Sequence, residues 1–211
     1  LSISRNIKLR INKLFNEVLN SQSNLTQLID ADVRLIGLIL HAPEQNIGKA
    51  LGEKSFVNRG NINLINNKQL TYLESGEHSY ELIREELNWL LTSIPPSLNV
   101  KFKLLNKASD FSEADTNTIY GGLIIEGLHC FFDNPNDPDA KEIYLRNFNE
   151  FTDEHTVVAI NICHMQQNQF CNHAHGIQFF NPAYFYPTRK GITAWGMEMI
   201  ELMVGKKILV D

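Results

Sequence analysis

The sequence predicts an α+β fold in which a helical first half precedes an antiparallel sheet. Apolar residues recur at helical spacing through much of residues 1–95. Apolar residues then alternate with lysines over 100–104, which is typical of a half-buried strand. Two apolar runs, 156–162 and 177–182, are separated by a polar segment and can pair as an antiparallel hairpin.

Helices account for most of the first half. Apolar spacing predicts amphipathic helices over 7–19 and over 24–41. Ser79 can cap a third helix, which a pair of prolines at 95–96 stops. Between the second and third helices the pattern is weak, and we expect only a short strand over 62–65. Residues 1–95 are therefore assigned to a helical N-terminal region.

The second half, residues 96–211, is expected to hold the α+β region, or to continue a single domain. After the strand at 100–104, the pattern predicts a fourth helix over 118–132 that is apolar on most sides. Asp137 and Pro138 begin a fifth helix, and Thr193 begins the last one. The two strands of the expected hairpin lie between these last helices.

Composition excludes several classes of function. The 211 residues carry a net charge of −5 with ordinary apolar and charged fractions, which gives no reason to expect nucleic acid as a partner. No apolar run approaches the length of a membrane span. Three cysteines are few and odd in number, which argues against a disulfide framework and favours a reducing compartment.

The register of the hairpin sets two polar side chains opposite each other. If Ala159 pairs with Ile177, then His155 faces Asn181 at roughly 4.5–5.5 Å between directly opposed residues. A histidine held by an amide at that distance is the orienting pair of a nucleophilic hydrolase. A buried hairpin with an incidental histidine at its rim explains the same pattern. The residues alone leave both interpretations open.

These residues also resemble a known family. Phe179-Phe180-Asn181-Pro182, with His155 at the start of the preceding strand, is similar to the motif of papain-like cysteine hydrolases among bacterial effectors and toxins. That group includes YopT-type proteases and related glutamine deamidases. The resemblance covers residues 115–186 at most. It implies a papain-like helix packed on an antiparallel sheet, with His155 as the general base and Asn181 as its orienting residue.

The family carries its cysteine nucleophile at the first turn of a central helix, before an aromatic residue and glycine. The residue before Tyr120-Gly121 is Ile119, so the resemblance implies a vacated nucleophile position. It further implies an effector or toxin that acts on a protein amide, made in the bacterial cytoplasm and secreted into a host cell. The expected partner is a host or target protein. A catalytically inactive domain that binds a partner protein is the alternative.

A dense group of soft and imidazole ligands lies near the tip of the expected hairpin and consists of Cys163, His164, Cys171, His173 and His175. Cys163, Cys171, His173 and His175 are the residue types of a tetrahedral zinc site, which gives a zinc-binding hairpin module as a second alternative. Their spacing matches no zinc-finger pattern. A polar hairpin tip with partly buried thiols is the simpler interpretation, and we expect no metal or other cofactor.

Glu126 and His129 match the last two polar residues of a His-Glu-x-x-His zinc helix. The residue before Glu126 is Ile125, so one of the two histidine ligands is missing. The pattern favours a simple polar edge on the fourth predicted helix.

Overall fold

The fold is α/β, with a parallel sheet. The computed structural model describes residues 25–46, 75–92, 101–172, 188 and 191–211. Within them, five strands form one sheet in which every strand pair is parallel. The strands are β1 (Leu35–Leu40), β2 (Lys101–Leu104), β3 (Thr118–Glu126), β4 (Val157–Asn161) and β5 (Leu209–Val210). The predicted α+β class with an antiparallel, papain-like sheet core is therefore wrong.

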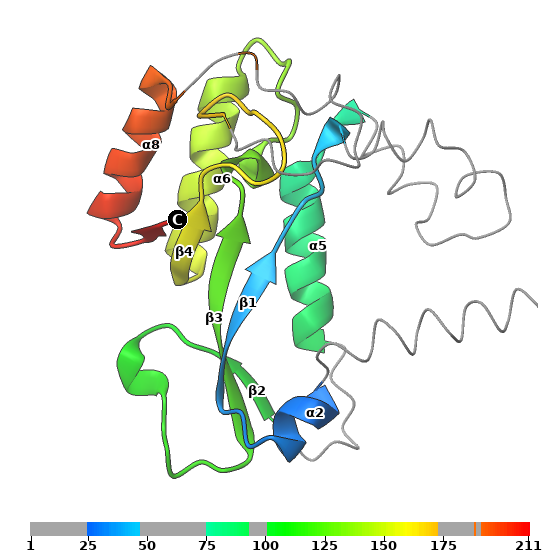
Figure 1. Ribbon diagram of the computed structural model, residues 1–211, viewed down its shortest axis with the longest axis vertical. Helices are drawn as coiled ribbons and strands as arrows, with labels where there is room; N and C mark the ends of the chain where they lie inside the picture. The colour runs from blue at the N-terminus through cyan, green and yellow to red at the C-terminus, as the bar shows by residue number, and fades with distance from the viewer. Residues whose placement is uncertain (1–24, 47–74, 93–100, 173–187, 189–190) are drawn as a thin grey trace, which may run out of the picture.

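The central strand of the sheet is β3 (Figure 1). β1 pairs along one of its edges, from Tyr120 to Ile125. The other edge is shared, because β2 pairs with the first part of β3 and β4 pairs with the part after Leu123. The register shifts between Leu123 and Ile124, where this second edge passes to β4. Both edges of β3 are thus paired, and this strand sets the positions of β1, β2 and β4.

The predicted antiparallel hairpin fails at β4. Residues 157–161 form a strand, as the sequence predicts. However, the two neighbours of β4 are β3 and β5, and both pair with it in parallel. The expected partner strand, 177–182, lies outside the described residues. The sheet core is therefore built from strands far apart in the sequence, not from a local hairpin.

Residues 118–132 form a strand and a short 3-10 helix, η3 (Leu128–Phe131), and not the predicted fourth helix. The segment is rich in β-branched residues, which favour strands, and contains two adjacent glycines, which disfavour helix. A Cβ on Gly121 would come within 2.6 Å of the Phe102 ring and 2.7 Å of the Leu38 side chain. Glycine is required there because neighbouring strands crowd β3 from both edges.

The predicted second helix, 24–41, divides into α2 (Leu25–Asp30) and β1. The run Leu35–Leu40 is continuously apolar apart from one glycine, which fits a strand of a parallel sheet as well as it fits a helix. The pairing of β1 with β3 decides between the two. The predicted helix over 7–19 and the short strand over 62–65 lie outside the described residues.

The other helices occur where the sequence predicts them. They are α5 (Ser79–Thr92), α6 (Ala140–Glu154) and α8 (Ala194–Gly205). Thr193 caps α8, as expected, because its hydroxyl accepts a hydrogen bond from the backbone N–H of Gly196 at 3.0 Å. None of the described helices is long and apolar enough to cross a membrane.

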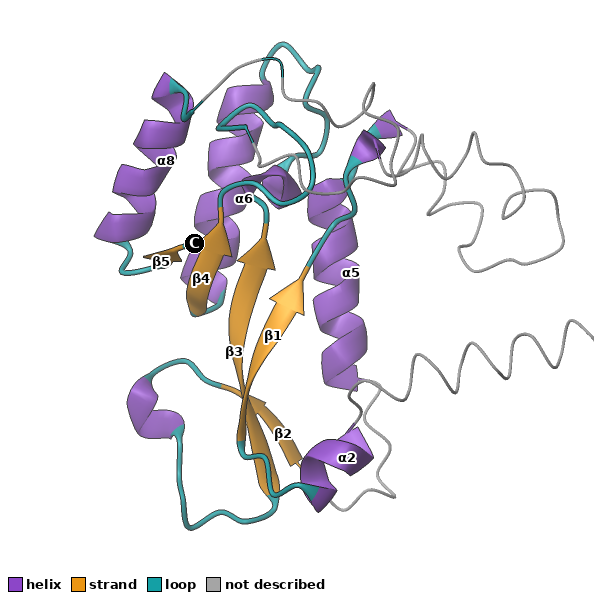
Figure 2. Ribbon diagram, viewed as in Figure 1, coloured by secondary structure: helices purple, strands orange, loops and turns teal. Residues whose placement is uncertain are grey.

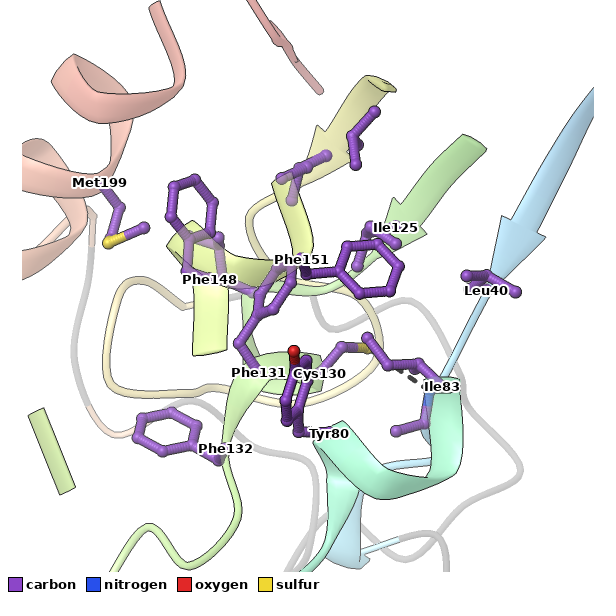
Figure 3. Packing of buried hydrophobic residues seen from close by; sticks show 14 of the residues in the cluster. Leu40, Tyr80, Ile83, Ile125, Cys130, Phe131, Phe132, Phe148, Phe151 and Met199 are labelled. Carbon is purple, nitrogen blue, oxygen red and sulfur yellow. Dashed lines mark hydrogen bonds between the residues drawn. The ribbon is translucent and has the colours of Figure 1, made fainter. Parts of the chain in front are cut away.

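One hydrophobic core joins these helices to the sheet (Figure 3). At its centre the Phe131 ring packs edge-to-face against Phe148 and Phe151, with centroid distances of 5.2 and 5.9 Å. Ile83 of α5 and Met199 of α8 are fully buried in the same cluster. Phe131 lies in η3, which follows the carboxyl end of β3. The packing of its ring therefore holds the chain in place where it leaves the central strand.

Phe131→Ala should destabilise the protein by about 3–5 kcal/mol, because it removes a fully buried ring and leaves a cavity. Urea denaturation followed by circular dichroism measures this change. Trp89→Ala is the matched control, since Trp89 is 64% exposed on α5, and it should change stability by no more than about 0.5 kcal/mol. Equal effects of the two substitutions would contradict this account of the core.

Candidate metal centre at the carboxyl edge of the sheet

Polar side chains gather where three parallel strands end. β1, β3 and β4 run in the same direction, so their carboxyl ends meet at one edge of the sheet (Figure 2). His41 directly follows β1, Glu126 is the last residue of β3, and His164 lies just beyond β4. Open α/β sheets bind their ligands at this edge.

Three of these side chains converge on one point. The Nε2 atom of His41 lies 3.2 Å from the Nδ1 atom of His164. Glu44 bridges the two rings, with Oε2 at 3.3 Å from His41 Nε2 and Oε1 at 3.3 Å from His164 Nδ1. One ligand atom from each residue lies within 4.8 Å of the others. The cluster therefore offers two imidazole nitrogens and a carboxylate to a single centre.

Neighbouring groups hold these side chains in place. The second nitrogen of the His164 ring, Nε2, lies 3.1 Å from Oε1 of Glu126. The backbone N–H of Met165 donates to Oε1 of Glu44 at 2.8 Å. The backbone N–H of His41 donates to Oε2 of Glu86 on α5 at 3.2 Å. The side chains of His164 and Glu44, and the backbone of His41, are thus each held by a contact outside the cluster.

The cluster can hold either a proton or a metal ion between its three side chains. When Glu126 accepts a proton from Nε2 of His164, the Nδ1 atom of that ring faces His41 and Glu44. A lone pair facing a carboxylate oxygen at 3.3 Å is repulsive unless a positive charge lies between them. Either a proton or a metal ion can supply that charge.

Glu44 supplies the negative charge of the cluster although it is only 3% exposed. Burial alone would raise the pKa of its carboxyl group. The hydrogen bond with His41, the charge of His129 and the Met165 N–H outweigh burial and lower the pKa of Glu44 to about 2. Glu44 is therefore an ionised ligand at any physiological pH.

His129 supports the segment that carries His41 and Glu44. Its Nε2 atom lies 2.5 Å from the carbonyl oxygen of Ala42, whose backbone N–H donates to the Cys130 thiol at 3.4 Å. Burial lowers the pKa of His129, and the ring donates its Nε2 proton to the carbonyl oxygen of Ala42. Both backbone groups of the fully buried Ala42 are thus held from the segment after β3.

The separations fit a tetrahedral metal ion. Zinc binds nitrogen and oxygen ligands at about 2.0–2.1 Å, which sets neighbouring tetrahedral ligands about 3.3 Å apart. The contacts within the cluster are 3.2 and 3.3 Å, and the two Glu44 contacts are made by different oxygens of its carboxylate, which would hold the ion from both sides. One ligand atom from each residue lies within 4.8 Å of the others. Glu126 behind His164 gives the carboxylate–histidine pair that commonly orients a histidine ligand of zinc.

Two of the residues expected from the family resemblance, His155 and Ile119, lie in the described part of the chain. His155 is the C-terminal cap of α6, and its Nε2 lies 3.8 Å from a Glu154 carboxylate oxygen. Ile119 is buried in β3 and lines a small cavity beneath α2, whereas His155 lines a different one beside α5. Asn181 lies outside the described residues. A catalytic role for His155 and Asn181 stays a prediction, but Ile119 does not begin a helix.

The expected zinc ligands near 163–175 are described only in part. Cys163 and Cys171 share a hydrogen bond, which together with burial raises the pKa of the Cys163 thiol. The Cys163 thiol also donates to the carbonyl oxygen of Gln166 at 2.9 Å. His173 and His175 lie outside the described residues. The Cys163 thiol is therefore protonated at neutral pH, and its hydrogen bonds stabilise the turn after β4.

The sequence analysis does not identify His41 and Glu44, and it groups His164 with the ligand types of the hairpin tip, for a reason that lies in the secondary structure. The pattern predicts Glu126 and His129 on the edge of one helix and His41 at the end of another. Three apolar runs, each followed within a few residues by histidine or glutamate, were the available signal. That signal has meaning only if the runs are parallel strands, because only then do their carboxyl ends meet.

Comparison with known proteins identifies no relative. No protein-family model matches the chain, and no curated protein matches its sequence. The functional argument therefore depends on the geometry of the site.

Gly127→Ala should destabilise the protein by about 2 kcal/mol or more, since Gly127 has φ of +102° and a Cβ there would overlap the His129 ring. Gly205→Ala is the control, because nothing lies within 4 Å of a Cβ at the end of α8, and it should be neutral or stabilising. Urea denaturation measures both variants. A neutral Gly127→Ala would show that the His129 contact is not tightly packed.

Proposed function

We propose that this protein is a zinc-dependent hydrolase whose metal is bound by His41, Glu44 and His164. The observation that carries the proposal is the set of 3.2–3.3 Å separations among their ligand atoms at the carboxyl edge of a parallel sheet. Two imidazoles and one carboxylate are the ligand set of many catalytic zinc sites. This proposal replaces the expectation of a protein without a cofactor.

The residue types favour zinc over other common ions. Calcium and magnesium prefer sites made entirely of oxygen ligands, and two of the three ligands here are nitrogens. Iron also binds two histidines and a carboxylate, but in octahedral geometry, where neighbouring ligands lie only about 3.0 Å apart. The observed separations of 3.2 and 3.3 Å agree better with a tetrahedral ion.

A zinc ion held by His41, Glu44 and His164 would acidify a water molecule and so supply a nucleophile near neutral pH. Glu126 would keep His164 in the tautomer that binds metal through Nδ1. Glu44 and His129 line a cavity of about 300 Å³, so this cavity reaches the cluster on its Glu44 side. Hydrolysis of a carbonyl compound is the reaction that this arrangement supports.

The purified protein should contain one zinc ion per chain by elemental analysis, and chelation should lower its melting temperature. His41→Ala, Glu44→Gln and His164→Ala should each remove most of this zinc, because two remaining ligands bind weakly. Iron in place of zinc, or no metal after reconstitution, would rule out the proposal.

Two matched controls separate this site from the sites expected from the sequence. His155→Ala should keep a full complement of zinc, because His155 lies at the end of α6, away from the cluster. The double substitution Cys163→Ser with Cys171→Ser should also keep it. If the double substitution removes zinc while His41→Ala does not, the zinc-binding hairpin module is the correct interpretation.

Glu126→Gln tests the orienting role of Glu126. The variant should still bind zinc, but about 10–100-fold more weakly, since losses of this size follow removal of a carboxylate behind a histidine ligand. Competition with a fluorescent zinc chelator measures the affinity. Glu86→Gln is the control, because Glu86 contacts only the backbone of His41, and its effect should be smaller. Wild-type affinity in Glu126→Gln would show that Glu126 does not orient the ligand.

A further inference from the structure

The cavity beside the metal cluster has an unusual lining. Among the described residues, its walls include Gln45, Gln166, Gln167, Gln169 and Asn136. Phe132 and two prolines add apolar surface, while the ionisable side chains that line it are Glu44 and His129. The wall is thus rich in carboxamides, and neither lysine nor arginine lines its described part.

Part of this wall is held rigidly. The Asn168 side chain accepts hydrogen bonds from the backbone N–H groups of Phe170 and Cys171, at 2.9 and 3.0 Å. The Gln167 amide makes two hydrogen bonds to Thr188, both 2.9 Å long. The segment 166–169, which directly follows His164, is therefore a preorganised wall and not a loose loop.

The charges around the cluster and the cavity disfavour a substrate that carries a negative charge. A bound zinc ion would be balanced by Glu44 and Glu126, both of which lie at the cluster. The residues of the cavity wall that the structure describes add no lysine or arginine, so desolvating a phosphate or carboxylate beside them would be costly. Gln45, Gln166 and Gln167 already use amide atoms in hydrogen bonds to Ser75, Asn46 and Thr188. The amide N–H of Gln166 and the exposed amides of Asn136 and Gln169 are the groups that can pair with an amide of the substrate.

Resting on the proposed zinc hydrolase, we propose that the substrate is an uncharged amide, an internal peptide bond or a neutral N-acyl group. The carboxamide wall binds the polar part of this substrate next to the metal. A cavity of about 300 Å³ lies at the lower end of ligand pockets and takes a group the size of one amino-acid residue. A substrate that ends in a free carboxylate is selected against.

A pair of hydroxamates tests this preference. Hydroxamates bind zinc as analogues of an amide, and the monohydroxamate of succinamide differs from that of succinate only in its uncharged end. The full chain is loaded with cobalt, whose absorption spectrum reports each ligand that reaches the metal. The carboxamide compound should bind at least about ten-fold more tightly than the carboxylate compound.

Gln169→Lys adds a cation at the rim of the cavity, where Gln169 is exposed. This variant should lose the preference or reverse it, while Gln169→Met, of similar length and uncharged, should keep the ten-fold preference of the wild type. An unchanged preference in Gln169→Lys would show that the two tails do not occupy this cavity, which would overturn the inference.

The remaining outcomes separate this inference from the proposed function. Failure of the protein to bind cobalt or zinc, or to bind acetohydroxamate once loaded, would overturn the zinc hydrolase and the inference with it. Normal binding of metal and acetohydroxamate, with equal or tighter binding of the carboxylate compound, would overturn only the uncharged-amide substrate. Binding of acetohydroxamate without binding of either longer compound would do the same.

Discussion

The pairing of β3 on both edges is the constraint on which the rest of the structure depends. β1 occupies one edge of this strand, and β2 and β4 divide the other between them. Because β1, β3 and β4 are parallel, three chain segments distant in sequence end at the same place. His41, Glu126 and His164 meet there without any local motif that joins them.

The buried charge of Glu44 at this edge of the sheet links the stability of the fold to the geometry of the site. Glu44 is almost fully buried and ionised, so it needs positive partners within the protein. His41 and His164 each face its carboxylate at 3.3 Å, where a proton or a metal ion can supply the positive charge. The contacts of Ala42 with His129 and Cys130 hold the segment between His41 and Glu44 in place. The side chains of the cluster are thereby fixed in place without a metal, which would reduce the entropic cost of ordering them when a metal binds.

The sequence predicted those elements whose signals are local. Helical periodicity and capping residues predict α5, α6 and α8. Local sequence patterns also predict the strands β2 and β4. β1 and β3 are continuous apolar runs, and periodicity cannot distinguish such a run from a buried helix. A prediction of helix for both segments leaves no strands to form the parallel sheet, so it also gives no sheet edge at which the site could lie.

The sequence by itself determined the capped helices, the apolar runs and the presence of histidines and glutamates just after those runs. Only the tertiary structure decided that the runs are parallel strands, since strand direction depends on pairing between distant residues and not on local preference. It also decided which polar side chains share a centre. His41 and His164 are separated by 123 positions, and their 3.2 Å contact exists only because β1 and β4 flank the same strand.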